Sequence, residues 1–184
     1  MRHDTGGNNL IDVNFIIDKA GIGDKMSIAD LGCGSMGRYV FEASRLVGKN
    51  GVAYAVNILK PILEVVARRA KQENVTNIKT VWSDLEVFNA TKIEAGSLDV
   101  TLMINTLYQS SKRVEILREA IRLTKKSGKI LIVEWKNIAL PFGPPIEVRV
   151  KKEMLIEAGR RLGLQLEEDF LAGQYHYGLI FTKL

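Results

Sequence analysis

Residues 27–37 read Ser27-Ile28-Ala29-Asp30-Leu31-Gly32-Cys33-Gly34-Ser35-Met36-Gly37. The apolar start predicts a short strand, and the glycines predict a tight turn before a helix that begins near Arg38. Glycine adopts backbone dihedrals that a Cβ forbids, and it lets the chain pass close to a ligand. The amides at the start of the following helix can face an anionic group. The pattern therefore predicts a strand–turn–helix unit that binds a nucleotide-like cofactor.

The acid before the turn discriminates between two classes of cofactor. Gly32 to Gly37 matches the G-x-G-x-x-G pattern of dinucleotide sites. A dinucleotide places its pyrophosphate against such a turn, where the carboxylate of Asp30 would repel it. S-adenosylmethionine presents an ammonium, a carboxylate and a sulfonium, so it can use both an acid and exposed amides. The residues favour S-adenosylmethionine over NAD. The alternative is that Asp30 caps the turn and the glycines allow tight packing.

Length and composition predict one ordinary soluble domain. The chain has 184 residues, of which 46% are hydrophobic and 26% are charged. No apolar run approaches the ~20 residues of a membrane span, and residues 1–7 lack the apolar core of a signal peptide. Cys33 is the single cysteine, which excludes an internal disulfide and a cysteine-based zinc cluster. We therefore expect a cytoplasmic protein without a metal site.

The formal net charge of +5 raises the question of a nucleic-acid partner. Lysines and arginines occur in short groups with acids between them, as on solvated helix faces. No aromatic residues alternate with a basic run, as stacking on single strands would require. Nucleic-acid binding is therefore possible but not favoured.

Strand-like and helix-like blocks alternate along the chain. Strands are expected at residues 27–31, 51–56, 77–82, 98–104, 129–135, 165–170 and 176–183. Helices are expected before Gly21, at 37–47, from Pro61 onward, at 112–125 with an end at Gly128, and at 151–162. This order predicts an α/β fold: a doubly wound, Rossmann-like seven-stranded sheet, mostly parallel with an antiparallel C-terminal strand. Ligands of such sheets bind at the carboxyl ends of the strands.

Five segments beside the strand ends form a recognisable set. They are Ala29–Gly34, Tyr54–Asn57, Trp82–Leu85, Ile104–Tyr108 and Ser127–Val133. The set resembles the motifs of class I S-adenosylmethionine-dependent methyltransferases, in particular the small-molecule branch of the ubiquinone/menaquinone-biosynthesis type. The resemblance covers residues 21–184. It implies a single S-adenosylmethionine-binding domain over residues 1–184, in which residues 1–20 form an N-terminal helix and a lid.

The resemblance assigns five residues to the methionine end of the cofactor. It implies that Asp30 orients the ammonium group, directly or through water. Gly32, Cys33 and Gly34 run along the methionine portion, where a thiol is expected to be a small packing residue rather than a nucleophile. Asn105 lines the same portion through its side chain or backbone; the alternative is an Asx turn at the strand end.

Four further residues are assigned to the adenosine end by the same resemblance. Asn57 meets the ribose and Ile58 flanks the adenine. Asp84 accepts from the adenine amine, and the amide of Leu85 serves a ring nitrogen. The alternative for Asp84 is a loop acid or helix cap.

Two positions depart from the family pattern. Met36 stands where the third glycine usually falls, with Gly37 one place later, so a wider turn is expected. Asn57 replaces the acid that usually accepts both ribose hydroxyls. An amide can accept one hydrogen bond and donate another, so cofactor binding is expected to be weaker by ~1 kcal/mol.

The resemblance implies S-adenosylmethionine-dependent methyl transfer to a small-molecule acceptor. An RNA methyltransferase and a non-catalytic S-adenosylmethionine-binding protein are the alternatives. No catalytic residue is assigned, because a base is needed only if the acceptor carries a proton. The candidates near the acceptor are Tyr108, Glu134, Trp135, His176 and Tyr177. A structural role is an open alternative for each of them.

Overall fold

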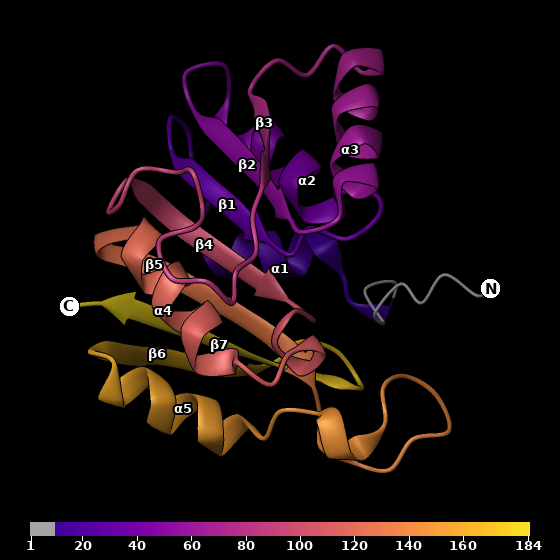
Figure 1. Ribbon diagram of the computed structural model, residues 1–184, viewed down its shortest axis with the longest axis vertical. Helices are drawn as coiled ribbons and strands as arrows, with labels where there is room; N and C mark the ends of the chain where they lie inside the picture. The colour runs from indigo at the N-terminus through magenta and orange to yellow at the C-terminus, as the bar shows by residue number, and fades with distance from the viewer. Residues whose placement is uncertain (1–9) are drawn as a thin grey trace.

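The computed structural model describes residues 10–184, which form a single seven-stranded sheet with helices on both faces (Figure 1). The strands are β1 (Ser27–Leu31), β2 (Val52–Asn57), β3 (Ile78–Trp82), β4 (Leu98–Ile104), β5 (Thr124–Trp135), β6 (Leu164–Leu171) and β7 (His176–Lys183). The α-helices are α1 (Val13–Ala20), α2 (Arg38–Val47), α3 (Lys60–Gln72), α4 (Arg113–Leu123) and α5 (Lys152–Arg161), with short 3-10 helices η2 (Leu107–Gln109) and η3 (Ile146–Val148).

The strand order is β3-β2-β1-β4-β5-β7-β6, from top to bottom in Figure 1. Strands β1 to β5 are mutually parallel, and β7 is antiparallel to both of its neighbours. The arrowhead of β4 accordingly lies at the right of the sheet and that of β7 at the left. The predicted mostly parallel, doubly wound sheet with an antiparallel C-terminal strand is confirmed. Because β1 and β4 are adjacent but not consecutive, the chain reverses direction across the sheet at β1.

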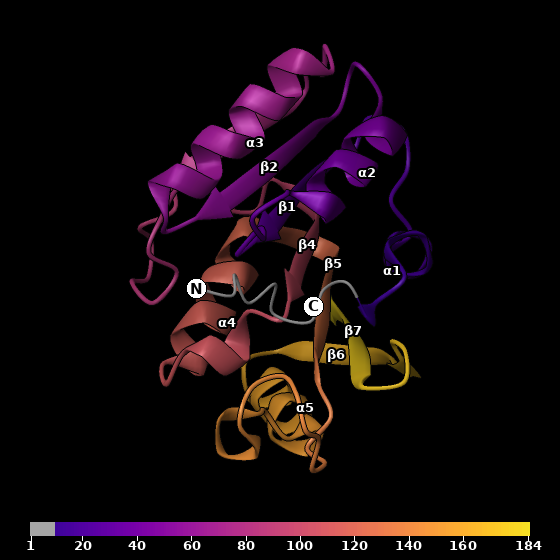
Figure 2. The same ribbon diagram turned by 90° about the vertical axis from the view of Figure 1, so that its right-hand side faces the viewer.

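Each face of the sheet carries its own apolar cluster. Helices α1, α2 and α3 bury their apolar residues on one face, and α4 and α5 bury theirs on the other. Figure 2 shows α1 and α4 on opposite sides of the central strands. In β5 successive residues alternate between the two clusters, as the pleat requires: Val133 belongs to the first and Ile132 to the second.

Local signals explain where several helices begin and end. The carboxylate of Asp12 accepts from the amides of Asn14 and Phe15 at the start of α1. Gly21 ends this helix in the left-handed conformation. Pro61 lies in the first turn of α3, where its missing N–H has no partner to lose. Within residues 10–184, no helix has the length and apolar character that a bilayer crossing requires.

The predicted helix over residues 112–125 and its end at Gly128 are wrong at the C-terminal side. Helix α4 ends at Leu123, and Thr124 already pairs with Leu98 as the first residue of β5. The Thr124 hydroxyl is buried, where it bonds the hydroxyl of Thr101 at 2.8 Å and the carbonyl of Ala120 at 2.7 Å. The contact with Thr101 and the pairing with Leu98, both in β4, draw the segment into the sheet, and helical periodicity does not reveal either of them.

The contact between β6 and β7 depends on a glycine. Gly178 pairs with Phe170, and a Cβ at Gly178 would lie 2.2 Å from Cζ of that ring. We expect Gly178→Ala to lower the free energy of unfolding by about 1–3 kcal/mol, because the core has no room for the methyl group. Urea denaturation measures this. Phe170→Leu on the G178A background should restore part of the loss, and an unaffected G178A variant would contradict this packing.

Candidate functional site

The ends of β1, β2 and β4 are joined by a compact set of backbone hydrogen bonds. The amides of Gly32 and Cys33 both donate to the carbonyl of Val56, at 2.9 and 3.0 Å. The hydroxyl of Thr106 donates to the carbonyl of Leu31 at 2.9 Å. The glycine turn is therefore held between the carboxyl end of β2 and Thr106, the second residue after β4.

Gly32 and Gly37 are required by backbone geometry. Gly32 has φ +82°, and a Cβ there would lie 2.7 Å from Oγ1 of Thr106. Gly37 has φ +58° and forms the N-cap of α2, and its amide donates to the carbonyl of Gly34 at 3.0 Å. Met36 has an exposed side chain. The turn thus extends to Gly37, as expected from the shifted third glycine.

Asp30 is a buried acid with an unused oxygen. Its side chain is 2% exposed, and Oδ2 has no hydrogen-bond partner among residues 10–184. Burial raises the pKa of this carboxyl to about 7. An acid in this setting is costly unless a partner arrives from outside the chain. The predicted contact of Asp30 with an ammonium group, and the alternative that Asp30 caps the turn, both stay predictions. The residue suits a cationic group such as an ammonium.

The side chain of Cys33 packs in the protein core. It is fully buried within the apolar cluster on the α2 face. Burial raises the pKa of its thiol, and the negative charge of Asp30 adds to the effect. A thiol in this state is not a nucleophile at neutral pH. Contact with the cofactor through the Cys33 backbone stays a prediction.

Asn57 is tied into the site on both sides. Its amide nitrogen donates to the carbonyl of Cys33 at 2.6 Å, and its oxygen accepts from the amide of Leu59 at 2.9 Å. The nitrogen thereby links β2 to the glycine turn. An amide oxygen carries a second lone pair, so one ribose hydroxyl can still donate to it. The structure thus gives Asn57 a positioning role beside its predicted binding role.

The three other adenosine-end residues gather past β2 and β3. The side chain of Ile58 is half exposed, and that of Leu85 is buried. Oδ1 of Asp84 accepts from the amide of Glu86 at 2.9 Å. Asp84 is therefore an acid of the loop after β3, and its contact with the adenine amine stays a prediction. Sequence reasoning missed Trp82, whose indole N–H donates to the carbonyl of Ile58 at 2.8 Å.

Asn105 meets a histidine from the far end of the chain. Its side-chain nitrogen lies 3.3 Å from Nε2 of His176, although 71 positions separate the two residues. Burial lowers the pKa of His176 to about 4, and the charges of Lys136 and Arg149 contribute, so the ring is neutral at pH 7. Donation from Asn105 to Nε2 places the ring proton on Nδ1. That nitrogen has no partner within residues 10–184.

The strand pleat separates the acceptor-side candidates. Glu134 and Tyr177 have the same parity as the residues that pack on α4 and α5. Glu134 accepts from the amide of Leu107 at 2.6 Å, and the Tyr177 hydroxyl donates to the carbonyl of Val150 at 2.8 Å. Burial raises the pKa of Glu134 to about 8, although the amide of Leu107 opposes the shift. These contacts give both residues structural roles, while Trp135 and His176 lie on the opposite face.

Trp135 and His176 belong to an aromatic cluster beside the carboxyl end of β5. The ring centroids of Trp135 and His176 are 4.3 Å apart, and those of Phe142 and Tyr175 are 4.9 Å apart. The ring centroids of Trp135 and Phe142 are 6.2 Å apart, and this contact joins the two pairs. Gly143, at φ +79°, lets the loop rest on the indole, because a Cβ there would lie 2.7 Å from Trp135.

A buried arginine fixes this loop. Arg149 is 4% exposed, and its guanidinium lies 5.3 Å from the Trp135 ring. It donates to four carbonyls, those of Lys136, Ile138, Phe142 and Pro144. Sequence reasoning missed Arg149, because a single arginine after a proline-rich loop has no distinguishing pattern.

The part of the expected N-terminal lid that ends at Gly7 lies outside the described residues. Residues 10–184 contain no group of three or more His, Cys, Asp or Glu side chains arranged to hold a metal ion.

Comparison with known proteins identifies the family. A family model described as a methyltransferase domain matches residues 22–160. The chain belongs to the methyltransferase-domain family. This assignment indicates S-adenosylmethionine as the methyl donor. The buried, unpartnered oxygen of Asp30 and the glycine turn suit the amino-acid end of that molecule.

Two named relatives are similar to part of this methyltransferase-domain protein. It is 28% identical over 117 residues to a demethylmenaquinone methyltransferase of Lactococcus lactis, covering 64% of this chain and 45% of that protein. It is 25% identical over 134 residues to a ubiquinone/menaquinone biosynthesis C-methyltransferase of Azotobacter vinelandii, covering 72% and 51%. The chain thus spans about half the length of the curated relatives it matches.

A solved structure shares the fold over nearly the whole chain. A SAM-dependent methyltransferase from Aquifex aeolicus superposes with a TM-score of 0.87 at 20% identity, covering 98% of this chain and 94% of that one. At this identity the likeness establishes the fold alone. The reaction has to be argued from the residues of the site.

The raised pKa of Asp30 predicts pH-dependent ligand binding. An ammonium group pairs with the ionised carboxylate, which predominates above about pH 7. We expect the affinity for S-adenosylhomocysteine to rise about tenfold from pH 6 to pH 8. In Asp30→Asn this rise should disappear, with ~10- to 100-fold weaker binding at pH 8. Titration calorimetry measures both, and the exposed Asp24→Asn variant is the matched control.

The raised pKa of Asp30 affects the stability of the fold in the opposite direction: the free energy of unfolding falls where ligand affinity rises. The carboxyl of Asp30 releases its proton near pH 3.8 when unfolded and near pH 7 when folded. Between these values the folded chain binds more protons, so the free energy of unfolding falls as pH rises. Asp30→Asn should remove this contribution. An identical pH profile of urea stability in wild type and D30N would contradict the burial of this acid.

Proposed function

We propose that this chain transfers a methyl group from S-adenosylmethionine to a small aromatic acceptor. The observation that carries the proposal is the buried Asp30 carboxyl with its unpartnered oxygen beside the glycine turn. This arrangement suits a zwitterionic amino-acid tail and is unfavourable for a diphosphate. Fold alone would not support the proposal, because one fold carries many reactions.

The roles of the chain follow from where its residues lie. When bound, S-adenosylmethionine supplies a methyl carbon that its sulfonium already activates. Asp30 and the turn at Gly32 and Gly34 hold the amino-acid end, while Asn57 and Asp84 hold the adenosine end. The chain then contributes alignment and exclusion of water, which account for much of the rate of a displacement reaction.

The aromatic cluster supports an acceptor with a flat ring. Phe142 is 41% exposed, so the cluster reaches the surface, and aromatic rings favour stacked or edge-on partners. The unpartnered Nδ1–H of His176 offers a hydrogen bond to an oxygen of such an acceptor. The names of the two curated relatives, a demethylmenaquinone methyltransferase and a ubiquinone/menaquinone biosynthesis C-methyltransferase, favour a quinone-type ring.

The distribution of charge argues against an RNA acceptor. Many of the basic side chains are paired with acids, as in the contacts Lys152–Asp169 at 2.6 Å and Arg69–Glu73 at 2.7 Å. Paired cations attract phosphates less strongly than a free basic stripe. RNA binding as the alternative and a cytoplasmic location stay predictions.

Binding and transfer are measured separately to test the proposal. We expect titration calorimetry to show binding of S-adenosylmethionine and S-adenosylhomocysteine, and methyl-labelled donor to label a soluble naphthohydroquinone. Gly32→Ala should abolish binding, because its Cβ would meet Thr106. Absence of binding by the wild-type chain would overturn the proposal.

Two other outcomes would select an alternative function. Binding of both ligands without transfer to any aromatic acceptor would favour a non-catalytic binding protein. Strongly salt-dependent retention on immobilised RNA would favour an RNA methyltransferase, because phosphate contacts weaken with salt.

A further inference from the structure

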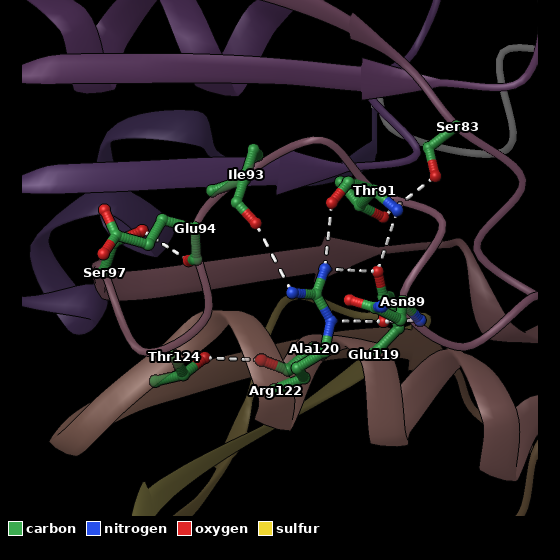
Figure 3. Close-up of polar contacts among 10 residues, drawn as sticks. All are labelled: Ser83, Asn89, Thr91, Ile93, Glu94, Ser97, Glu119, Ala120, Arg122 and Thr124. Atoms are coloured by element: carbon green, nitrogen blue, oxygen red, sulfur yellow. Dashed lines mark hydrogen bonds and ion pairs between the residues drawn. The ribbon is translucent and has the colours of Figure 1, made fainter.

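A buried ion pair on α4 holds the loop that follows β3. The carboxylate of Glu119 is fully buried and faces the guanidinium of Arg122 on the next turn of the helix. Nε and Nη2 of Arg122 donate to the two carboxylate oxygens at 2.9 and 2.8 Å. Figure 3 shows the pair beneath the loop.

Both members of the pair bind the loop backbone. Glu119 accepts from the amides of Asn89 at 2.8 Å and Thr91 at 3.0 Å. Arg122 donates to the carbonyls of Thr91 at 2.9 Å and Ile93 at 3.4 Å. One ion pair thus satisfies backbone groups at three loop residues, so the loop follows α4 rather than the sheet.

The charge of Glu119 persists over the whole useful pH range. Burial would raise the pKa of its carboxyl, but hydrogen bonds from Arg122 and from the loop amides of Asn89 and Thr91 outweigh it and lower the pKa to about 2. A glutamine would present N–H donors to these groups, which are donors themselves. Substitution should therefore release the loop.

The fixed end of the loop is connected to the predicted adenine site. The hydroxyl of Thr91 lies 2.9 Å from that of Ser83, and Ser83 directly precedes Asp84. The amide of Ser83 donates to the carbonyl of Asn57 at 3.1 Å. A continuous set of contacts therefore runs from Glu119 through Thr91 and Ser83 to the residue that faces the ribose.

We propose that Glu119, paired with Arg122, is a positioning residue that sets the place of Asp84 and Leu85 and thereby the selectivity of the site for adenine. The proposal rests on the proposed function, because it takes Asp84 and Leu85 as the adenine contacts. Glu119 touches no ligand in this role. It acts through the loop backbone.

Discrimination between two purine bases tests the proposal. Asp84 can accept from the 6-amine of adenine but repels the 6-oxo group of hypoxanthine. We expect the wild-type chain to bind S-adenosylhomocysteine at least ~10-fold more tightly than S-inosylhomocysteine. In Glu119→Gln the ratio should fall below ~3-fold, because the loop no longer holds Asp84 in place. A loss of stability alone would not change this ratio.

The matched control lies on the same helix. Glu115 forms an exposed pair with Arg118 at 3.3 Å and does not touch the loop. Glu115→Gln should keep the wild-type ratio. If E119Q does not fold, Thr91→Val serves instead. This change removes the hydrogen bond between the hydroxyls of Thr91 and Ser83, and it keeps the hydrogen bond from the amide of residue 91 to Glu119. An unchanged ratio in folded E119Q, or in T91V where it replaces E119Q, would overturn the proposal.

Amide exchange without any ligand separates this proposal from the function on which it rests. In E119Q the amides of Asn89 and Thr91 should exchange at least ~10-fold faster than in wild type and E115Q. Unchanged exchange would overturn the role of Glu119 whatever the chain binds. Failure of the wild-type chain to bind S-adenosylhomocysteine would instead overturn the proposed function, while the exchange result still decides whether Glu119 holds the loop.

Discussion

The junction of β1, β2 and β4 is the constraint on which the rest of the site depends. One carbonyl, that of Val56, accepts from two successive amides of the glycine turn. On the other side the hydroxyl of Thr106, the second residue after β4, donates to the carbonyl of Leu31. A turn held this closely has no room for a Cβ at Gly32. The backbone can therefore approach a ligand only in the one arrangement that these hydrogen bonds select.

The junction also explains why an acid is kept in the core. Asp30 is the penultimate residue of β1, and the neighbouring strands bury it almost completely. Its Oδ2 has no hydrogen-bond partner among residues 10–184, which is unfavourable for a buried acid. An unfavourable group of this kind is commonly found at functional sites, where a ligand satisfies it. Asn57 complements the arrangement: where the family usually has a second acid, a neutral amide ties the turn to β2.

The strand-end motifs could be located from the sequence because each depends on local pattern. The acid and glycines after β1 combine an apolar run with turn residues, and both signals are local. The end of α4 was mistaken for the opposite reason. The spacing of apolar residues in α4 gives no sign that the helix ends before Thr124. The hydroxyl of Thr124 bonds that of Thr101 in β4, and a contact between distant residues leaves no mark on the periodicity.

The order of strands and helices along the chain, the glycine turn and the acid before it can be predicted from the amino acids, since hydrophobic period and backbone preference act over a few residues. Which polar groups meet depends on how the strands and helices pack together. This packing brings His176 to Asn105, Arg149 to four loop carbonyls and Glu119 to the loop after β3. These partners are far apart in the chain or carry no pattern of their own. Burial leaves a polar group few alternatives to such a partner, and burial exists only once the sheet and helices have packed.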